Sequence, residues 1–184
     1  IFIITFYVIM FGVFIAQLIL HLDVDKTTNN LLGKKDVLSY ALQTNYYLVQ
    51  LTGMFRTLEN IESNKLTPVE LGSIFAPPLV YVDIAVGISA SLIQANQALM
   101  KTMTNSTDSI RDNYFKTDIR MYDNYFGSAD QTYVVLDSFS STNRIIEKAL
   151  AILAIQALDT TQGTELFSQI YRNSLNDLII KNQK

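Results

Sequence analysis

The sequence predicts an all-α protein in which a transmembrane helix over residues 1–22 is followed by an antiparallel up-and-down helical bundle over residues 23–184. Residues 1–20 contain no charged side chain, and only Thr5 and Gln17 are clearly polar. The rest of the chain holds about four long segments in which apolar residues recur every three or four positions, as on one face of a helix. Three prolines and seven glycines leave little room for the frequent turns of an all-β fold.

Residues 1–20 are expected to cross a membrane, because about 20 apolar residues rising ~1.5 Å each span the hydrocarbon core of a bilayer. A cleaved signal peptide is disfavoured: no Lys or Arg precedes the run, the run is long, and residues 21–25 do not resemble a cleavage site of small residues. A buried helix of a soluble protein would need apolar neighbours on every side, which a remainder of ordinary composition would hardly provide.

The membrane topology beyond this helix stays open, because only one flank is visible and its lysines and aspartates nearly balance. Since the chain starts with Ile1 and ends at Lys184 without a helix stop signal, we expect a fragment that leads into a second transmembrane helix. We expect the bundle on the extracellular or lumenal side. There Asn105, in the sequence Asn-Ser-Thr, would accept a glycan.

The first half of the bundle is predicted from periodicity and from one strong boundary signal. Residues 36–63 form an amphipathic pattern of about seven helical turns. In residues 67–70, Thr-Pro-Val-Glu, the threonine suits the N-cap, the proline suits the first helical position, and the glutamate can accept a hydrogen bond from the backbone N–H of the threonine. A short helix should therefore run from here to Ala76. Residues 79–103 predict another long helix. A second membrane span over residues 74–93 is the alternative, disfavoured by two prolines and by Asp83.

A short repeat predicts a continuous aromatic face. The sequence Asp-Asn-Tyr-Phe at residues 112–115 recurs at residues 123–126, a spacing of eleven residues and therefore close to three helical turns. On one helix, Phe115, Tyr122 and Phe126 would share a face. We take this face as either a ligand-contact surface or, as is usual for aromatic stripes at helical spacing, a packing surface.

The second half of the bundle is predicted as two helices. One covers residues 130–158, with a weak or kinked section at residues 138–142 and its most buried part at residues 149–158. A turn at residues 160–163 should follow, with Gly163 in a left-handed conformation. The last helix should begin near Thr164 and Glu165 and continue to the end of the chain.

Little in the sequence indicates chemistry. There is one histidine, His21, no cysteine, no Ser-His-Asp set, no metal-ligand spacing and no glycine-rich phosphate loop. We therefore expect no catalytic residues, no metal and no cofactor. A net charge of −3 without a basic run longer than Lys34-Lys35 argues against nucleic acid as a partner. Five arginines are spread over the expected helices: Arg56, Arg111, Arg120, Arg144 and Arg172. Any two of them that faced the inside of the bundle together would suit an anionic ligand.

Three short elements carry a family resemblance: NYYL at residues 45–48, FRTL at residues 55–58 and NSLNDLI at residues 173–179. Together with the Asn-, Ile- and Tyr-rich bias, they resemble the inter-transmembrane helical regions of large PAS-containing multi-pass proteins of ciliates and other protists, the tiny-macrocysts type. The resemblance implies a eukaryotic sensory or mechanosensitive membrane protein and carries no functional residues. A bacterial-style four-helix receptor ectodomain fits the pattern nearly as well.

The sequence thus predicts a membrane-anchored sensor or receptor domain and not an enzyme. A ligand or a mechanical load would shift or rotate the helix that joins the bundle to its membrane span. The alternative is a structural or scaffolding subunit of a larger membrane complex without a ligand, which predicts long apolar stripes left exposed by the chain. Expected partners are the lipid bilayer and either further copies of the chain or other membrane subunits.

Overall fold

Helices make up most of the chain in the computed structural model, which confirms the predicted helical class. The structure describes residues 2–62, 78–104, 106, 108–123, 132–155, 161–174 and 177–182. The described helices are α1 (Phe2–Glu62), α3 (Pro78–Met103), α4 (Asp108–Phe115), α5 (Ser138–Ile155), α6 (Thr161–Ser174) and α7 (Asp177–Asn182). Two short strands, β1 (Ile119–Tyr122) and β2 (Tyr133–Leu136), add an element that the sequence did not predict.

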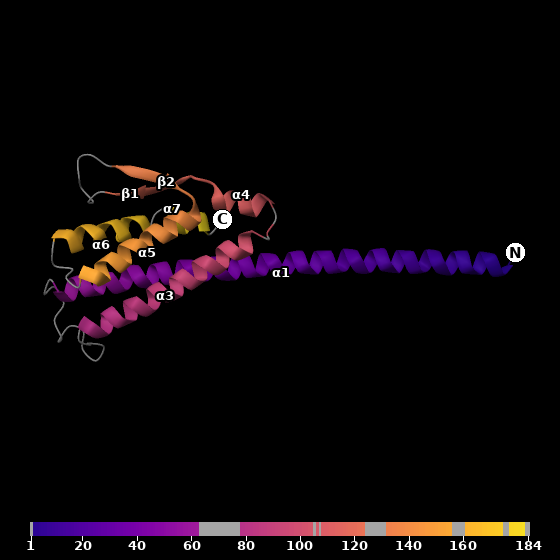
Figure 1. Cartoon of the computed structure of the whole chain (residues 1–184), viewed down its shortest axis with the longest axis horizontal. Helices are drawn as coiled ribbons and strands as arrows, with labels where there is room; N and C mark the ends of the chain where they lie inside the picture. Colours follow the sequence, from indigo (N-terminus) through magenta and orange to yellow (C-terminus); the bar gives the residue numbers. More distant parts are fainter. Residues whose placement is uncertain are drawn as a thin grey trace.

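The dominant element is α1, an unbroken helix of 61 residues and therefore about 90 Å long. Its first half extends away from the rest of the molecule, and its second half lies within the bundle (Figure 1). From residue 11 to residue 36 every side-chain position is exposed apart from the partly buried Gly33, and the first buried side chain among the described ones is Val37. The helix passes from its free part into the bundle without a break.

The predicted membrane span over residues 1–22 is not confirmed. Within the part of the chain whose side chains the structure describes, no helix contains an apolar stretch long enough to cross a membrane. Residues 1–10, about half of the predicted span, lie outside that part.

The bundle has the predicted up-and-down arrangement. The long helices α1, α3, α5 and α6 run alternately in opposite directions, and the C-terminal α7 returns to the end of the bundle from which α1 emerges (Figure 1). The helix predicted over residues 79–103 is α3, which packs along the second half of α1 instead of standing apart as a second span. All of its buried residues except Ala95 recur every three or four positions, as an amphipathic bundle helix requires: Tyr81, Ala85, Ser89, Leu92, Asn96, Leu99 and Met103.

The main core lies where α3, α5 and α6 meet at the second half of α1. In α1 the fully buried apolar residues are spaced three and four apart and form one face: Leu48, Leu51, Phe55 and Leu58. Leu92 of α3, Ile145 of α5 and Ile170 of α6 belong to the same core, as do residues of β1 and α7. A smaller cluster fills the end of the bundle near residue 37 and joins α1, α3 and α4: Val37, Ala41, Leu99, Met103 and Tyr114.

The predicted helix through residues 112–126 is wrong. The helix α4 ends at Phe115, and β1 pairs antiparallel with β2, with Ile119 opposite Leu136 and Tyr122 opposite Tyr133. Ile119 and Met121 are buried while Arg120 between them is exposed, which is the two-residue period of a strand. The eleven-residue repeat therefore does not place its two copies on one helix. Residues 124–131, including most of the second copy, lie outside the described residues.

Some smaller predictions also need correction. The helix predicted from residue 130 begins only at Ser138, after β2. The section at residues 138–142 is not weak but is the first part of α5, because Asp137 caps it: its Oδ1 accepts a hydrogen bond from Ser140 N at 2.8 Å. The helix α6 begins at Thr161, so Gly163 lies in its first turn and not in a preceding turn. In residues 149–155 Ala149 is buried, but Leu150 is 46% exposed, so this part is not buried on all faces. The predicted helix at residues 67–76 lies outside the described residues, as do residues 156–160.

The edge of β1 that faces away from β2 is held by α6. Tyr122 N donates to Asn173 Oδ1 at 2.8 Å, and Asn173 Nδ2 donates to Tyr122 O at 2.9 Å. Gln169 Nε2 donates to Asp123 O at 2.6 Å. The amide side chain of Asn173 thus satisfies the two backbone groups that a neighbouring strand would otherwise pair with, and it fixes the small sheet on the helices.

Replacing Leu51 by Ala tests whether the face of α1 is the structural core. Leu51 is fully buried, so Leu51→Ala leaves a cavity and should lower the free energy of unfolding by about 2–5 kcal/mol. Leu150→Ala makes the same change at a half-exposed helix position and should cost less than about 1 kcal/mol. Urea denaturation followed by circular dichroism measures both. Equal losses in the two variants would contradict the placement of the core.

Candidate functional site

The structure places the predicted aromatic residues on different elements. Phe115 ends α4 and packs against the smaller core cluster, with its ring edge-to-face on Tyr114 at 5.1 Å between centroids. Tyr122 lies on β1, where the guanidinium carbon of Arg172 is 3.4 Å from the ring centroid. Phe126 lies outside the described residues, as does the predicted glycan acceptor Asn105. The structure therefore does not bring Phe115 and Tyr122 onto one helical face.

The feature best shaped to hold a ligand is a cavity of about 550 Å³ at the end of the bundle from which α1 emerges. Residues 34–41 of α1 form one wall, and α3, α4, the first residue of α5 and α7 form the others. Its apolar lining comes from three helices: Val37, Ala41, Leu99, Met103 and Ile110. This volume falls within the range of about 300–1,000 Å³ that is typical of small-molecule sites.

A polar network holds the helices around this cavity in place. Asn96 of α3 donates through Nδ2 to Asn143 Oδ1 of α5 at 3.0 Å, and Tyr114 Oη of α4 donates to Asn96 Oδ1 at 3.4 Å. Burial raises the pKa of the Tyr114 phenol, and the charge of Asp137 raises it further. Tyr114, which also lines the cavity, therefore stays protonated and neutral at every physiological pH.

One lining side chain has an unmet hydrogen bond. Ser138, the first residue of α5, is 1% exposed, and its Oγ has no hydrogen-bond partner among the described residues. A buried hydroxyl left without a partner costs about 1–3 kcal/mol. Because Ser138 lines the cavity, a ligand atom that accepts a hydrogen bond from this hydroxyl would remove that cost.

Among the described side chains, the charged residues that line the cavity are both cations, Lys34 of α1 and Lys181 of α7. Lys181 Nζ lies 2.5 Å from Asp118 Oδ1 and donates to Lys116 O, so its charge is largely matched. Lys34 is exposed and forms no ion pair within the described part of the chain. The cavity therefore has an apolar interior with an excess of positive charge at its margin.

Two of the arginines singled out in the sequence do converge, but away from this cavity. Arg144 forms an ion pair with Asp123, and Arg172 lies over Tyr122, so both contact the end of β1. Asp123 offsets the charge of Arg144, and this site is better explained as a structural link between β1 and the helices. Among the described residues no group of acidic or histidine side chains is placed to hold a metal ion.

Sequence reasoning missed the cavity because its wall is assembled from five separate elements. No motif or spacing joins Lys34, Leu99, Ser138 and Lys181.

Comparison with known proteins gave no match. No family model matches the chain, and the searches of curated proteins and of solved structures found no significant similarity. The resemblance to protist PAS-containing membrane proteins therefore stays a prediction, and function has to be argued from the geometry.

The ion pair between Asp118 and Lys181 predicts a pH dependence. The hydrogen bond from Lys181 lowers the pKa of Asp118 in the folded state, and the charges of Lys181 and Lys116 contribute to this shift. The stabilisation is then present above the unfolded pKa of about 3.9 and is lost as the pH falls through the lower folded value. The difference in unfolding free energy between the wild type and Asp118→Asn should therefore shrink from neutral pH to strongly acidic pH.

Urea denaturation at several pH values measures this difference. Asp112→Asn serves as the matched control, because Asp112 is 74% exposed and lies 3.8 Å from Arg111 in a surface pair. A loss of stability in Asp118→Asn that is the same at acidic and neutral pH would show that the pair does not link α7 to the start of β1 electrostatically.

Proposed function

We propose that this chain is a membrane-anchored sensor domain in which α1 carries the conformational state of the bundle to its anchor. The observation that supports it is the position of α1, which is at once a wall of the cavity, a part of the main core and the whole of the free extension. A change at the cavity that moves residues 34–41 therefore moves the extension with them.

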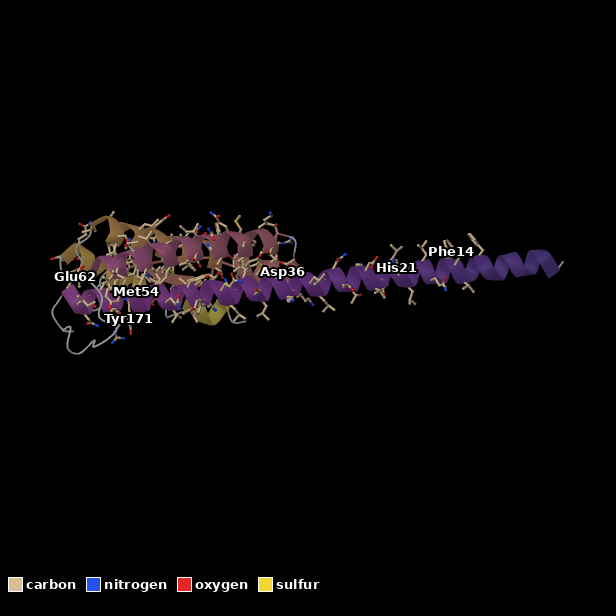
Figure 2. The ribbon with its side chains drawn as sticks, turned by 90° about the horizontal axis from the view of Figure 1, so that it is seen from below. Phe14, His21, Asp36, Met54, Glu62 and Tyr171 are labelled. Atoms are coloured by element: carbon tan, nitrogen blue, oxygen red, sulfur yellow. The ribbon has the colours of Figure 1, made fainter. Side chains whose placement is uncertain are left out.

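The anchor is proposed for the apolar start of α1. Phe11, Phe14, Leu20 and Leu22 are 59–70% exposed and belong to the part of α1 that extends beyond the bundle. Figure 2 shows Phe14 and His21 on this free part, well away from Asp36, where the bundle begins. Contiguous apolar surface of this kind usually marks contact with a membrane or a partner. With the uncharged residues 1–10 before it, a bilayer is the occupant we propose.

The coupling is proposed to be mechanical. A ligand that binds one arrangement of the bundle better than another shifts the population toward that arrangement. Small helix shifts of about 1–2 Å are a common form of such switching. A straight helix transmits an axial shift over its whole length, because its backbone hydrogen bonds keep the rise per residue constant.

A second candidate function is a scaffolding subunit, and one observation favours it. The face of α1 turned away from the bundle carries apolar side chains that are each at least half exposed: Val24 54%, Leu31 62%, Leu38 60%, Leu42 57% and Val49 50%. Val24, Leu31 and Leu38 recur every seven residues, and Leu42 and Val49 continue the pattern at the position four residues later. Such a stripe suits a partner helix, either from a second copy of the chain or from another subunit.

The two candidate functions differ in whether the conformation of the bundle responds to a displacement of the anchor. Because coupling is reciprocal, displacing the anchor of a sensor must change the arrangement of the bundle helices, whereas the bundle of a scaffold on a passive tether keeps its arrangement. The chain has no cysteine, so Gln43→Cys on α1 and Gln97→Cys on α3 allow clean nitroxide labelling of two exposed positions. The double variant is diluted with unlabelled chains and placed in nanodiscs of short-chain and of long-chain phospholipids.

Pulsed electron paramagnetic resonance should show that the distance between the two labels shifts by about 1–2 Å between the thin and the thick bilayer. The control replaces Thr27, Thr28 and Asn29, in the free part of α1, by Gly. Three glycines weaken the helix there and should abolish the shift while leaving the bundle folded. The same label distance in both bilayers for the uninterrupted chain would reject the sensor and favour the scaffold.

A further inference from the structure

We propose that the cavity at the end of the bundle binds a single-chain amphiphile with an anionic head group, such as a long-chain fatty acid or a lysophospholipid with a phosphate head. The inference rests on the proposed sensor function in one respect, since it names the ligand that would occupy the sensor's site. Its support comes from the size of the cavity, from its lining and from the place of the cavity in the molecule.

The size and the interior suit an acyl chain. A methylene group is about as large as a water molecule, roughly 30 Å³, so a volume of about 550 Å³ has room for a chain of more than about ten carbons. The interior is formed by Val37, Ala41, Leu99 and Met103, all less than 9% exposed as residues. A cavity with this lining favours binding of a flexible apolar group, because the group displaces water from the apolar side chains.

The polar groups of the lining suit an acceptor with negative charge. Ser138 Oγ is buried without a hydrogen-bond partner among the described residues, and Ser138 lines the cavity, so an acceptor atom of a ligand that reaches this hydroxyl supplies the missing hydrogen bond. Lys34 supplies an unmatched positive charge, and no carboxylate lines the cavity among the side chains that the structure describes. Asp137, which precedes α5, accepts hydrogen bonds from Ser140, whose N and Oγ lie 2.8 and 2.9 Å from its two carboxylate oxygens. A cationic or a neutral head group would form no ion pair with Lys34.

The cavity lies at the end of the bundle that faces the proposed membrane, and this membrane would supply such a ligand. The cavity is lined by residues 34–41 of α1 and therefore lies where the extension of this helix meets the bundle, at the level that Asp36 marks in Figure 2. If the extension enters a bilayer, this is the end of the bundle that faces the membrane surface. Single-chain amphiphiles are most concentrated in the bilayer itself, which on this placement ends near Leu22, 12 helical residues and so about 18 Å before Lys34.

Binding is tested with radiolabelled tetradecanoate and the 184-residue chain in nanodiscs of zwitterionic lipid, with empty nanodiscs as the blank. We expect saturable binding in the wild type. Ser138→Ala should weaken it about tenfold, because a hydrogen bond to a charged group is lost while no hydrogen bond of the folded chain is broken. Lys34→Gln should weaken it about threefold, and less at high salt. Ala41→Phe, which fills the cavity, should abolish it.

Matched controls lie outside the cavity. Ser91→Ala and Lys101→Gln make the same chemical changes on α3 at positions that do not line the cavity, and both should bind tetradecanoate as the wild type does. Tetradecanol and tetradecyltrimethylammonium, with neutral and cationic heads, should show no saturable binding. Comparison with a lysophosphatidic acid of equal chain length identifies the head group: tighter binding indicates phosphate, and weaker binding indicates carboxylate.

Two results would overturn the proposal. One is the absence of saturable binding of both anionic amphiphiles to the wild type; the other is equal binding to the wild type and to Ser138→Ala and Lys34→Gln. Neither depends on the variant Ala41→Phe being folded. The outcome is separable from the sensor function. A label distance that responds to bilayer thickness without ligand binding would reject the ligand class alone, whereas binding without that response would reject the sensor alone.

Discussion

Burial of one face of α1 is the interaction on which the rest of this structure depends. Leu48, Leu51, Phe55 and Leu58 are almost completely removed from solvent, and side chains of this type contribute about 1.5–3 kcal/mol each when fully buried. Both α3 and α6 pack on α1, and α5 packs on α3 and α6 in turn. Since the same helix continues unbroken into the free extension, the packing of the bundle also fixes the direction in which the extension points.

Buried polar pairs fix how the helices are aligned along one another. Thr52 Oγ1 of α1 and Ser174 Oγ of α6 lie 2.7 Å apart in the core, and Asn96 of α3 pairs with Asn143 of α5. An apolar face alone tolerates sliding by a turn, whereas a displaced pair of this kind would leave polar groups unsatisfied. One pair links α1 to α6, and the other links α3 to α5. A shift of α1 against α6 therefore has to break the contact between Thr52 and Ser174, as the helix shift proposed above requires.

The sequence predicts the long helices well because their burial pattern is strong and local. The helix expected at residues 79–103 is α3, and the apolar positions expected on residues 36–63 include the buried face of α1. The hairpin was missed because each strand has four residues, too few to separate a strand period from a helical one once the repeat had suggested a helix. The start of α5 was missed because the signal is a single cap, Asp137. The cavity has no sequence signature, since it depends on how five elements meet.

The central claim is that α1 is one rigid helix from the proposed anchor to the core, and a single distance tests it. Nitroxide labels at Asp23→Cys, in the free extension, and Gln50→Cys, on the exposed side of the bundle part, are separated by 27 helical residues and so by about 40 Å. Pulsed electron paramagnetic resonance in nanodiscs should give one narrow distance distribution near this value. A broad distribution centred at a shorter distance would mean that α1 bends between the two labels, and it would contradict transmission along α1.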